Sequence, residues 1–104
     1  MQDKNLAAIA LIAGVLALTP LAAAAYSGQQ YASQAKLTIA QARSIALKTV
    51  PGGKIVDEEL EKEKGGSGLR YSFDVKLNNQ THEVGVDAKT GKVLENSVEG
   101  ANSD

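Results

Sequence analysis

Cysteine is absent from the 104 residues, and histidine occurs only once. Without cysteine the chain has no disulfide framework, no cysteine-ligated zinc or iron–sulfur site, no thiol nucleophile and no lipid anchor on cysteine. A single histidine excludes a metal site built from several histidines. The 11 Lys and Arg nearly balance the 12 Asp and Glu, so no net field attracts the chain to nucleic acid or an anionic membrane. We therefore expect no cofactor, no metal and no nucleic-acid partner.

A long segment without charged residues lies near the N-terminus and ends in alanines. Residues 6–18 read LAAIALIAGVLAL, and a Thr-Pro pair and then LAAAA follow. An apolar core of about 7–15 residues before an Ala-x-Ala site is typical of a secretory signal peptide, although the leading MQDKN is only weakly basic. We predict a signal peptide over residues 1–25, cleaved after Ala25. The protein would then be periplasmic or secreted, with no stable membrane span after cleavage.

Other interpretations of this segment stay open. Cleavage after Ala24 fits the same small residues. An uncleaved membrane anchor would need about 20 apolar residues, a length reached here only by counting the Thr-Pro pair and several alanines. A cytosolic helix is the remaining alternative.

The rest of the chain is long enough for one small domain. Residues 26–36 are small and polar, which favours a flexible linker, and residues 99–104 have the composition of a disordered tail. We therefore expect the folded domain over residues 37–98. No internal repeat is visible at this length.

The pattern from residue 38 onward predicts a helix. Thr38 and Gln41 have the spacing of a capping box, in which each side chain accepts a hydrogen bond from the other residue's main-chain N–H. The polar Arg43 falls mainly outside the apolar stripe, and Pro51-Gly52-Gly53 ends the helix. A helix this short is unstable alone in water, so it must pack on another element. The stripe consists of Ile39, Ala42, Ile45, Ala46 and Val50.

Alternating patterns after the helix predict strands over residues 54–64, 69–77, 80–88 and 92–98. Asn78-Asn79 has the composition of a two-residue hairpin turn. In the first strand, strict alternation places Val56, Glu58 and Leu60 on one face. Ile55 falls on the other face with the acidic residues. We predict an α+β fold: one N-terminal helix packs on a small antiparallel sheet of three to four strands, and the other sheet face is wet.

Two groups of side chains are candidates for function. Four carboxylates share one face of the first strand: Asp57, Glu59, Glu61 and Glu63. We interpret them as a solvated face that protects an edge strand, with a docking patch for a basic partner and a weak calcium site as alternatives. His82 is in phase with Val84 and Val86, so we interpret it as a packing residue, with a metal ligand or a pH switch as the alternative.

Catalysis by a Ser–His–Asp site would have to combine His82 with Ser44 or Ser72 and with Asp74. The alternation places Ser72 and Asp74 on the sheet face away from the core, and nothing in the sequence suggests an oxyanion hole. We therefore expect that the protein is not an enzyme.

Several motifs follow one another in a characteristic order. They are a capped Ala-x-x-x-Ala helix, a Pro-Gly-Gly break, an acidic alternating strand, a Tyr-x-Phe-x-Val strand and a closing Glu-Val-x-Val-Asp-Ala-x-Thr-Gly-x-Val. Over residues 37–96 this arrangement resembles a PepSY domain. Two residues depart from the family pattern: His82 stands where an aromatic is usual, and Gly85 where a longer polar residue is usual. The matching residues are Ala42, Ala46, Pro51, Gly52, Gly53, Leu60, Tyr71, Phe73, Val75, Glu83, Val84, Val86, Asp87, Ala88, Thr90, Gly91 and Val93.

The resemblance implies an exported domain without catalytic residues. PepSY domains occur in the propeptides of thermolysin-like metallopeptidases, where they restrain the protease, and alone in small periplasmic proteins. The implied function is a binding module that regulates or inhibits a peptidase or another envelope protein through protein–protein contact. The alternative is a periplasmic small-ligand or metal sensor, and a homodimer formed through a sheet edge is also open. The candidate contact residues are Asp57, Glu59, Glu61, Glu63, His82 and Gly85.

Overall fold

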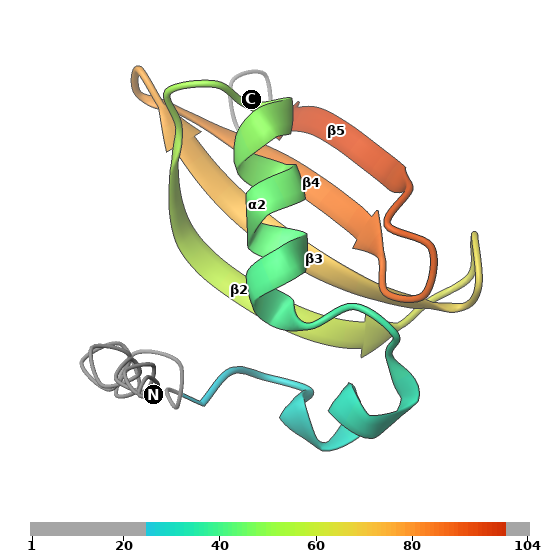
Figure 1. Cartoon of the computed structure of the whole chain (residues 1–104). Coiled ribbons are helices and arrows are strands. Elements are labelled where there is room, and N and C mark those ends of the chain that lie inside the picture. Colours follow the sequence, from blue (N-terminus) through green and yellow to red (C-terminus); the bar gives the residue numbers. More distant parts are fainter. Residues whose placement is uncertain (1–24, 100–104) are drawn as a thin grey trace, which may run out of the picture.

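One α-helix packs on one face of a four-stranded antiparallel sheet (Figure 1). The structure, a computed structural model, describes residues 25–99, so the predicted signal peptide and tail lie outside it except for Ala25 and Glu99. The strand order is β2-β3-β4-β5, so each strand pairs with its neighbour in sequence, and the predicted α+β fold is confirmed. The elements are the 3-10 helix η1 (Gln29–Gln34), α2 (Ile39–Thr49), β2 (Lys54–Lys62), β3 (Leu69–Leu77), β4 (Gln80–Asp87) and β5 (Val93–Glu99).

Local signals determine where α2 begins and how closely it approaches the sheet. Thr38 Oγ1 accepts from the Gln41 N–H at 3.1 Å, and the Thr38 N–H donates to Gln41 Oε1 at 2.9 Å, which forms the predicted capping box. Ala42 and Ala46 on the buried face are fully buried, and their small side chains let the helix lie close to the strands. Within residues 25–99, no helix has the length and apolar character needed to cross a bilayer.

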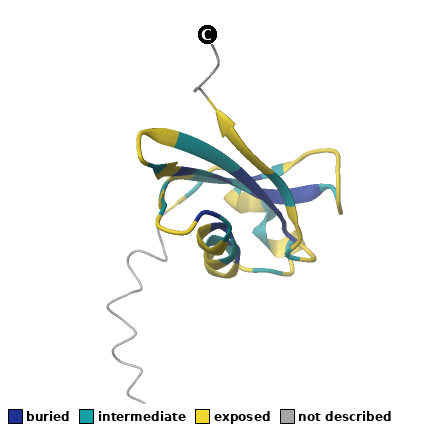
Figure 2. Cartoon of the chain, turned by 90° about the horizontal axis from the view of Figure 1, so that it is seen from above, coloured by how far each residue is buried: buried dark blue, intermediate teal, exposed yellow. Residues whose placement is uncertain are grey.

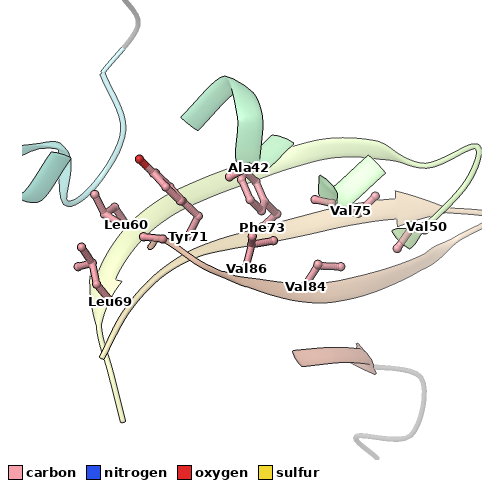
Figure 3. Packing of buried hydrophobic residues seen from close by; sticks show 11 residues of the cluster. Ala42, Val50, Leu60, Leu69, Tyr71, Phe73, Val75, Val84 and Val86 are labelled. Atoms are coloured by element: carbon pink, nitrogen blue, oxygen red, sulfur yellow. The ribbon is translucent and has the colours of Figure 1, made fainter. Parts of the chain in front are cut away.

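The core lies between α2 and the two central strands (Figure 3). The Tyr71 hydroxyl donates to the Leu37 carbonyl oxygen at 2.8 Å, so the polar end of this buried ring has a partner. Burial raises the pKa of Tyr71 to about 12. Each fully buried aromatic or aliphatic side chain contributes about 1.5–3 kcal/mol, so this layer holds the domain together. The side chains that β3 and β4 send toward the helix, at most 1% exposed, are Tyr71, Phe73, Val75, Val84 and Val86.

A β-bulge at Val56 changes the face assignment expected for β2. The register of β2 against β3 shifts between Ile55 and Asp57, so Val56 is an inserted residue. Our prediction that Ile55 lies on the face of the acidic residues is therefore wrong, because Ile55 pairs with Val75 and packs against the core. Val56 lines the helix-side groove together with Glu58, but it is 54% exposed and does not join the core. From Asp57 onward the predicted phase holds.

The residues before α2 pack along the outer edge of β2. Residues 26–36, for which we expected a flexible linker, contain η1 and lie beside β2 (Figure 1). Ser27 and Glu59 form a parallel bridge, and the Leu60 N–H donates to the Ser27 carbonyl oxygen at 2.8 Å. The Lys62 ammonium lies 4.9 Å from the centre of the Tyr31 ring, a cation–π contact. The composition of residues 26–36 predicted a flexible linker. The contacts seen here are made with the edge of β2, which is distant in sequence, so the local composition gives no sign of them.

Asp87 joins two loops at one end of the sheet. Its side chain is 1% exposed, and Ser67 donates to it through both its N–H, at 2.6 Å, and its hydroxyl, at 2.8 Å. The N–H groups of Lys89 and Thr90 donate to the same carboxylate at 2.8 and 3.1 Å. Burial alone would raise the pKa of Asp87, but these bonds outweigh burial and lower the pKa to about 2. The turn after β4 is thereby tied to the loop between β2 and β3.

Replacing Asp87 by Asn is expected to lower the free energy of unfolding by about 2 kcal/mol at neutral pH, because one carboxylate oxygen becomes a donor that faces the Ser67 N–H. The pKa of Asp87 falls on folding from 3.8 to about 2, so its stabilisation is complete above the unfolded value and is lost as the pH falls through the folded one. Urea unfolding as a function of pH measures both effects. Asp74→Asn is the matched control, and an equal loss in both variants would contradict the assignment.

Replacing Gly28 by Ala is expected to detach the N-terminal segment from β2. Gly28 has a φ of 85°, and a Cβ atom there would overlap the Leu60 carbonyl group. Gly68 is the matched control, since its φ is 91° but a Cβ atom would meet nothing within 4 Å, so Gly68→Ala adds backbone strain of about 1–2 kcal/mol and no clash. Amide hydrogen exchange at Leu60 should accelerate in Gly28→Ala only. Unchanged exchange in that variant would show that the segment tolerates the substitution.

Candidate functional site

The sheet face opposite α2 carries most of the acidic side chains. Figure 2 shows the helix against one face of the sheet only. The cross-strand pairs place carboxylates from all four strands on the other face, because directly paired residues share a face. We call this surface the acidic face; its residues are Asp57, Glu59, Glu61, Asp74, Glu83, Glu95 and Glu99. It also holds the cations Lys54, Arg70 and Lys76, fewer than the carboxylates.

Like charges lie directly opposite one another on the acidic face. Asp74 of β3 pairs with Asp57 on one side and with Glu83 on the other. The pKa values of Glu59, Asp74 and Glu83 are raised. Partial burial is the largest single cause, and repulsion from neighbouring carboxylates adds to it. Unfavourable pairs of this kind destabilise a sheet, so the acidic face lowers the stability of the isolated domain.

Arg70 is a largely buried cation near one end of this surface, paired with Glu61 of β2. It is 8% exposed, donates to the Lys64 carbonyl oxygen at 3.1 Å, and lies 3.5 Å from Glu95 Oε1. A Cβ atom at Gly85 would stand 3.1 Å from Arg70 Nη1, so the glycine leaves the space that the guanidinium occupies. The departure at Gly85 from the family pattern therefore has a physical reason, because a longer side chain would displace Arg70.

The structure separates the predicted contact residues into three places. Asp57, Glu59, Glu61 and Gly85 lie on the acidic face. Glu63 follows one residue after the end of β2 and is exposed, and the neighbouring Glu61 raises its pKa. His82 pairs with Val75 and Val98, so it lies on the helix side of the sheet, partly buried. It therefore cannot act together with the carboxylates on the other face.

The residues considered for a catalytic site also lie on opposite faces of the sheet. Ser72 and Asp74 lie on the acidic face, so the sheet stands between them and His82. Ser72 instead donates to Glu61 Oε2 at 2.6 Å. Among residues 25–99, no three His, Asp or Glu side chains converge closely enough to hold a metal ion.

A groove of about 650 Å³ lies between α2 and β2 and is also lined by residues 25–27; we call it the α2–β2 groove. Arg43 of the helix donates to Glu58 of the strand through Nε and Nη2, both at 2.8 Å, so a bidentate ion pair joins the two elements. Next to this pair lie Leu47 and Val56, which are 40% and 54% exposed. The groove therefore combines an exposed apolar surface with main-chain groups of an edge strand.

Several residues of these two surfaces were not among the predicted contacts. Alternation within β3 and β4 already assigns Asp74 and Glu83 to the wet face. The sequence did not give the strand register, which places these two carboxylates directly opposite each other. Glu95 and Glu99 join them through the pairing of β5. The α2–β2 groove had no signal in the sequence, because it depends on the bulge at Val56 and on the place where the helix crosses the sheet.

A protein-family model described as "Peptidase propeptide and YPEB domain", PepSY, matches residues 36–96, more than half of the chain. The match begins just before the cap of α2 and ends within β5, so it includes the helix and most of the sheet. The resemblance expected from the motifs is confirmed. No curated protein and no solved structure matches the chain.

Replacing Glu83 by Gln is expected to stabilise the domain at neutral pH by about 0.5 kcal/mol, because it removes one charge from a row of like charges. The pKa of Glu83 is higher in the folded chain, so folding takes up protons there and stability decreases as the pH rises through that pKa. The gain should therefore disappear in acid. Thermal unfolding measures it, with Glu58→Gln as the matched control that breaks the Arg43 pair and should destabilise. A destabilised Glu83→Gln variant would contradict the repulsion.

Proposed function

Since the chain belongs to the PepSY family of peptidase propeptide and YPEB domains, we propose that it is an exported, non-catalytic module that regulates or inhibits a peptidase or another envelope protein by direct contact. The family description links such domains to peptidase propeptides. The apolar run at residues 6–18 and the following Ala-x-Ala site support export.

The single observation that carries the proposal is the acidic face. Carboxylates from four strands share one surface that no helix of residues 25–99 covers, although their repulsion destabilises the isolated domain. A partner with a basic surface would neutralise these charges and convert the repulsion into attraction across the interface. Complementary charge would also accelerate association, and this acceleration weakens as salt is added.

The contact residues proposed on this surface are Asp57, Glu59, Glu61 and Gly85, together with Glu63 at its rim. Gly85 contributes indirectly, since it leaves room for the Arg70 guanidinium, which lies 3.5 Å from Glu95 Oε1. His82 lies on the helix side, so its role in binding stays a separate hypothesis.

The proposal can be tested by capture of the partner with a charge-matched control. The bait is the protein with a tag at its C-terminus, purified from cells after any processing of its N-terminus. It is cross-linked to its partners in an envelope extract. Glu59→Gln with Glu83→Gln neutralises the centre of the acidic face. Ala40→Lys with Gln80→Lys changes the net charge equally, at exposed positions on the helix side.

We expect the wild type and the helix-side control to recover the same envelope protein, and the acidic-face variant to recover about fivefold less of it or lower. A recovered peptidase is then assayed with and without the purified chain, and its activity should fall. Equal recovery by both double variants would exclude the acidic face as the contact surface. Recovery of the bait alone would contradict the proposed module and indicate self-association.

A further inference from the structure

Within residues 25–99, the outer edge of β2 is covered over only part of its length. β2 is the first strand of the sheet, so its outer main-chain groups face away from β3. The N-terminal segment pairs with this edge at Glu59 and Leu60 through Ser27. Toward the start of β2, no other described segment forms a main-chain hydrogen bond with residues 54–57. We call residues 54–57 the open edge.

The open edge adjoins an exposed apolar surface. Val56, turned outward by the bulge, and Leu47 of α2 both line the α2–β2 groove and are among the few large apolar residues exposed in residues 25–99. Native proteins usually protect sheet edges, and an exposed edge beside apolar side chains favours the addition of another strand. This edge already accepts a parallel neighbour, since Ser27 pairs with it in that direction.

The two faces of β2 define the chemistry of an added strand. Successive side chains of a strand point to opposite faces of the sheet. On the helix side, an added strand would meet Leu47 and Val56, which suit apolar side chains. On the other side, it would meet Asp57 and Glu59 at the border of the acidic face, which suit Lys or Arg. The complementary segment therefore alternates apolar and basic residues.

We propose that the open edge and the α2–β2 groove bind an extended peptide segment of alternating apolar and basic residues, which joins the sheet as a parallel strand beside β2. This inference rests on the proposed function, because it names the chemistry of the partner segment. Main-chain hydrogen bonds would supply affinity, and the alternation would supply specificity and register.

The test uses a defined probe, the peptide acetyl-Val-Lys-Val-Lys-Val-Lys-amide. The probe is titrated into the protein purified from cells after any processing of its N-terminus. Val56→Lys should weaken binding by about tenfold, because it places a like charge and a polar group in the apolar groove. Val98→Lys is the matched control: Val98 is also an exposed valine on an edge strand, 39% exposed, but it belongs to β5. Binding to this control should stay within about twofold of the wild type.

Two altered probes separate the contributions. Replacing each Lys of the probe by Glu should abolish binding, since the acidic border would then repel it. N-methylation of alternate residues should also abolish binding, since it removes the main-chain donors. Amide exchange should slow over residues 54–57 and not over β5 when the unmodified probe binds. Equal weakening by Val56→Lys and Val98→Lys, or slower exchange in β5 alone, would overturn the assignment to β2.

The outcome is distinguishable from that of the capture experiment. If Glu59→Gln with Glu83→Gln loses the natural partner while Val56→Lys binds the probe like the wild type, the open edge is excluded and the proposed function stands. If the probe behaves as expected while the acidic-face variant retains its partner, the edge is a binding site and the acidic face is not the main contact. Dimerisation of the wild type that Val56→Lys abolishes would assign the edge to a second copy of the chain and overturn the peptide assignment.

Discussion

The packing of a single helix against one side of the sheet is the constraint on which the other features of this domain depend. Tyr71, Phe73 and Val75 alternate along β3 and meet Ala42 and Ala46 of α2, so nearly all the apolar burial lies on that side. No helix in the described part of the chain covers the opposite face, so that face carries polar side chains. One helix also cannot shield both edges of four strands, and the groove beside β2 is where its cover ends. The two candidate interaction surfaces are thus consequences of how the core is built.

The carboxylates of this small domain have two opposite effects on its stability. Asp87 is buried and accepts hydrogen bonds from two loops, so its negative charge is stabilised and its pKa is low, about 2. Glu59, Asp74 and Glu83 lie among like charges, and their pKa values are raised. The first arrangement stabilises the fold. The second reduces stability but creates a negative potential, which would attract a basic partner of the kind proposed above.

The bulge at Val56 connects the fold to the second surface. One inserted residue returns Ile55 to the core, keeps the carboxylates that follow on the acidic face, and turns Val56 toward solvent beside Leu47. Bulges re-aim side chains at the edges of sheets, and here the re-aimed residue faces a groove. The N-terminal segment shows that the same edge accepts a parallel strand, although it covers only the later part of β2.

The sequence by itself determined the local elements and the family. The Thr38 cap, the Pro-Gly-Gly break, the Asn78-Asn79 turn and the alternation of β3 each depend on a few neighbouring residues, so they could be predicted, as could the PepSY resemblance that the family match confirms. The tertiary structure alone decided the phase of β2 before its bulge, the docking of η1 on the edge of β2, and the gathering of Asp74, Glu83, Glu95 and Glu99 beside the predicted acids. The physical reason is that strand register and helix placement arise from contacts between residues distant in sequence. A local pattern can give the face of each side chain within its own strand, but not which charges from other strands will stand next to it.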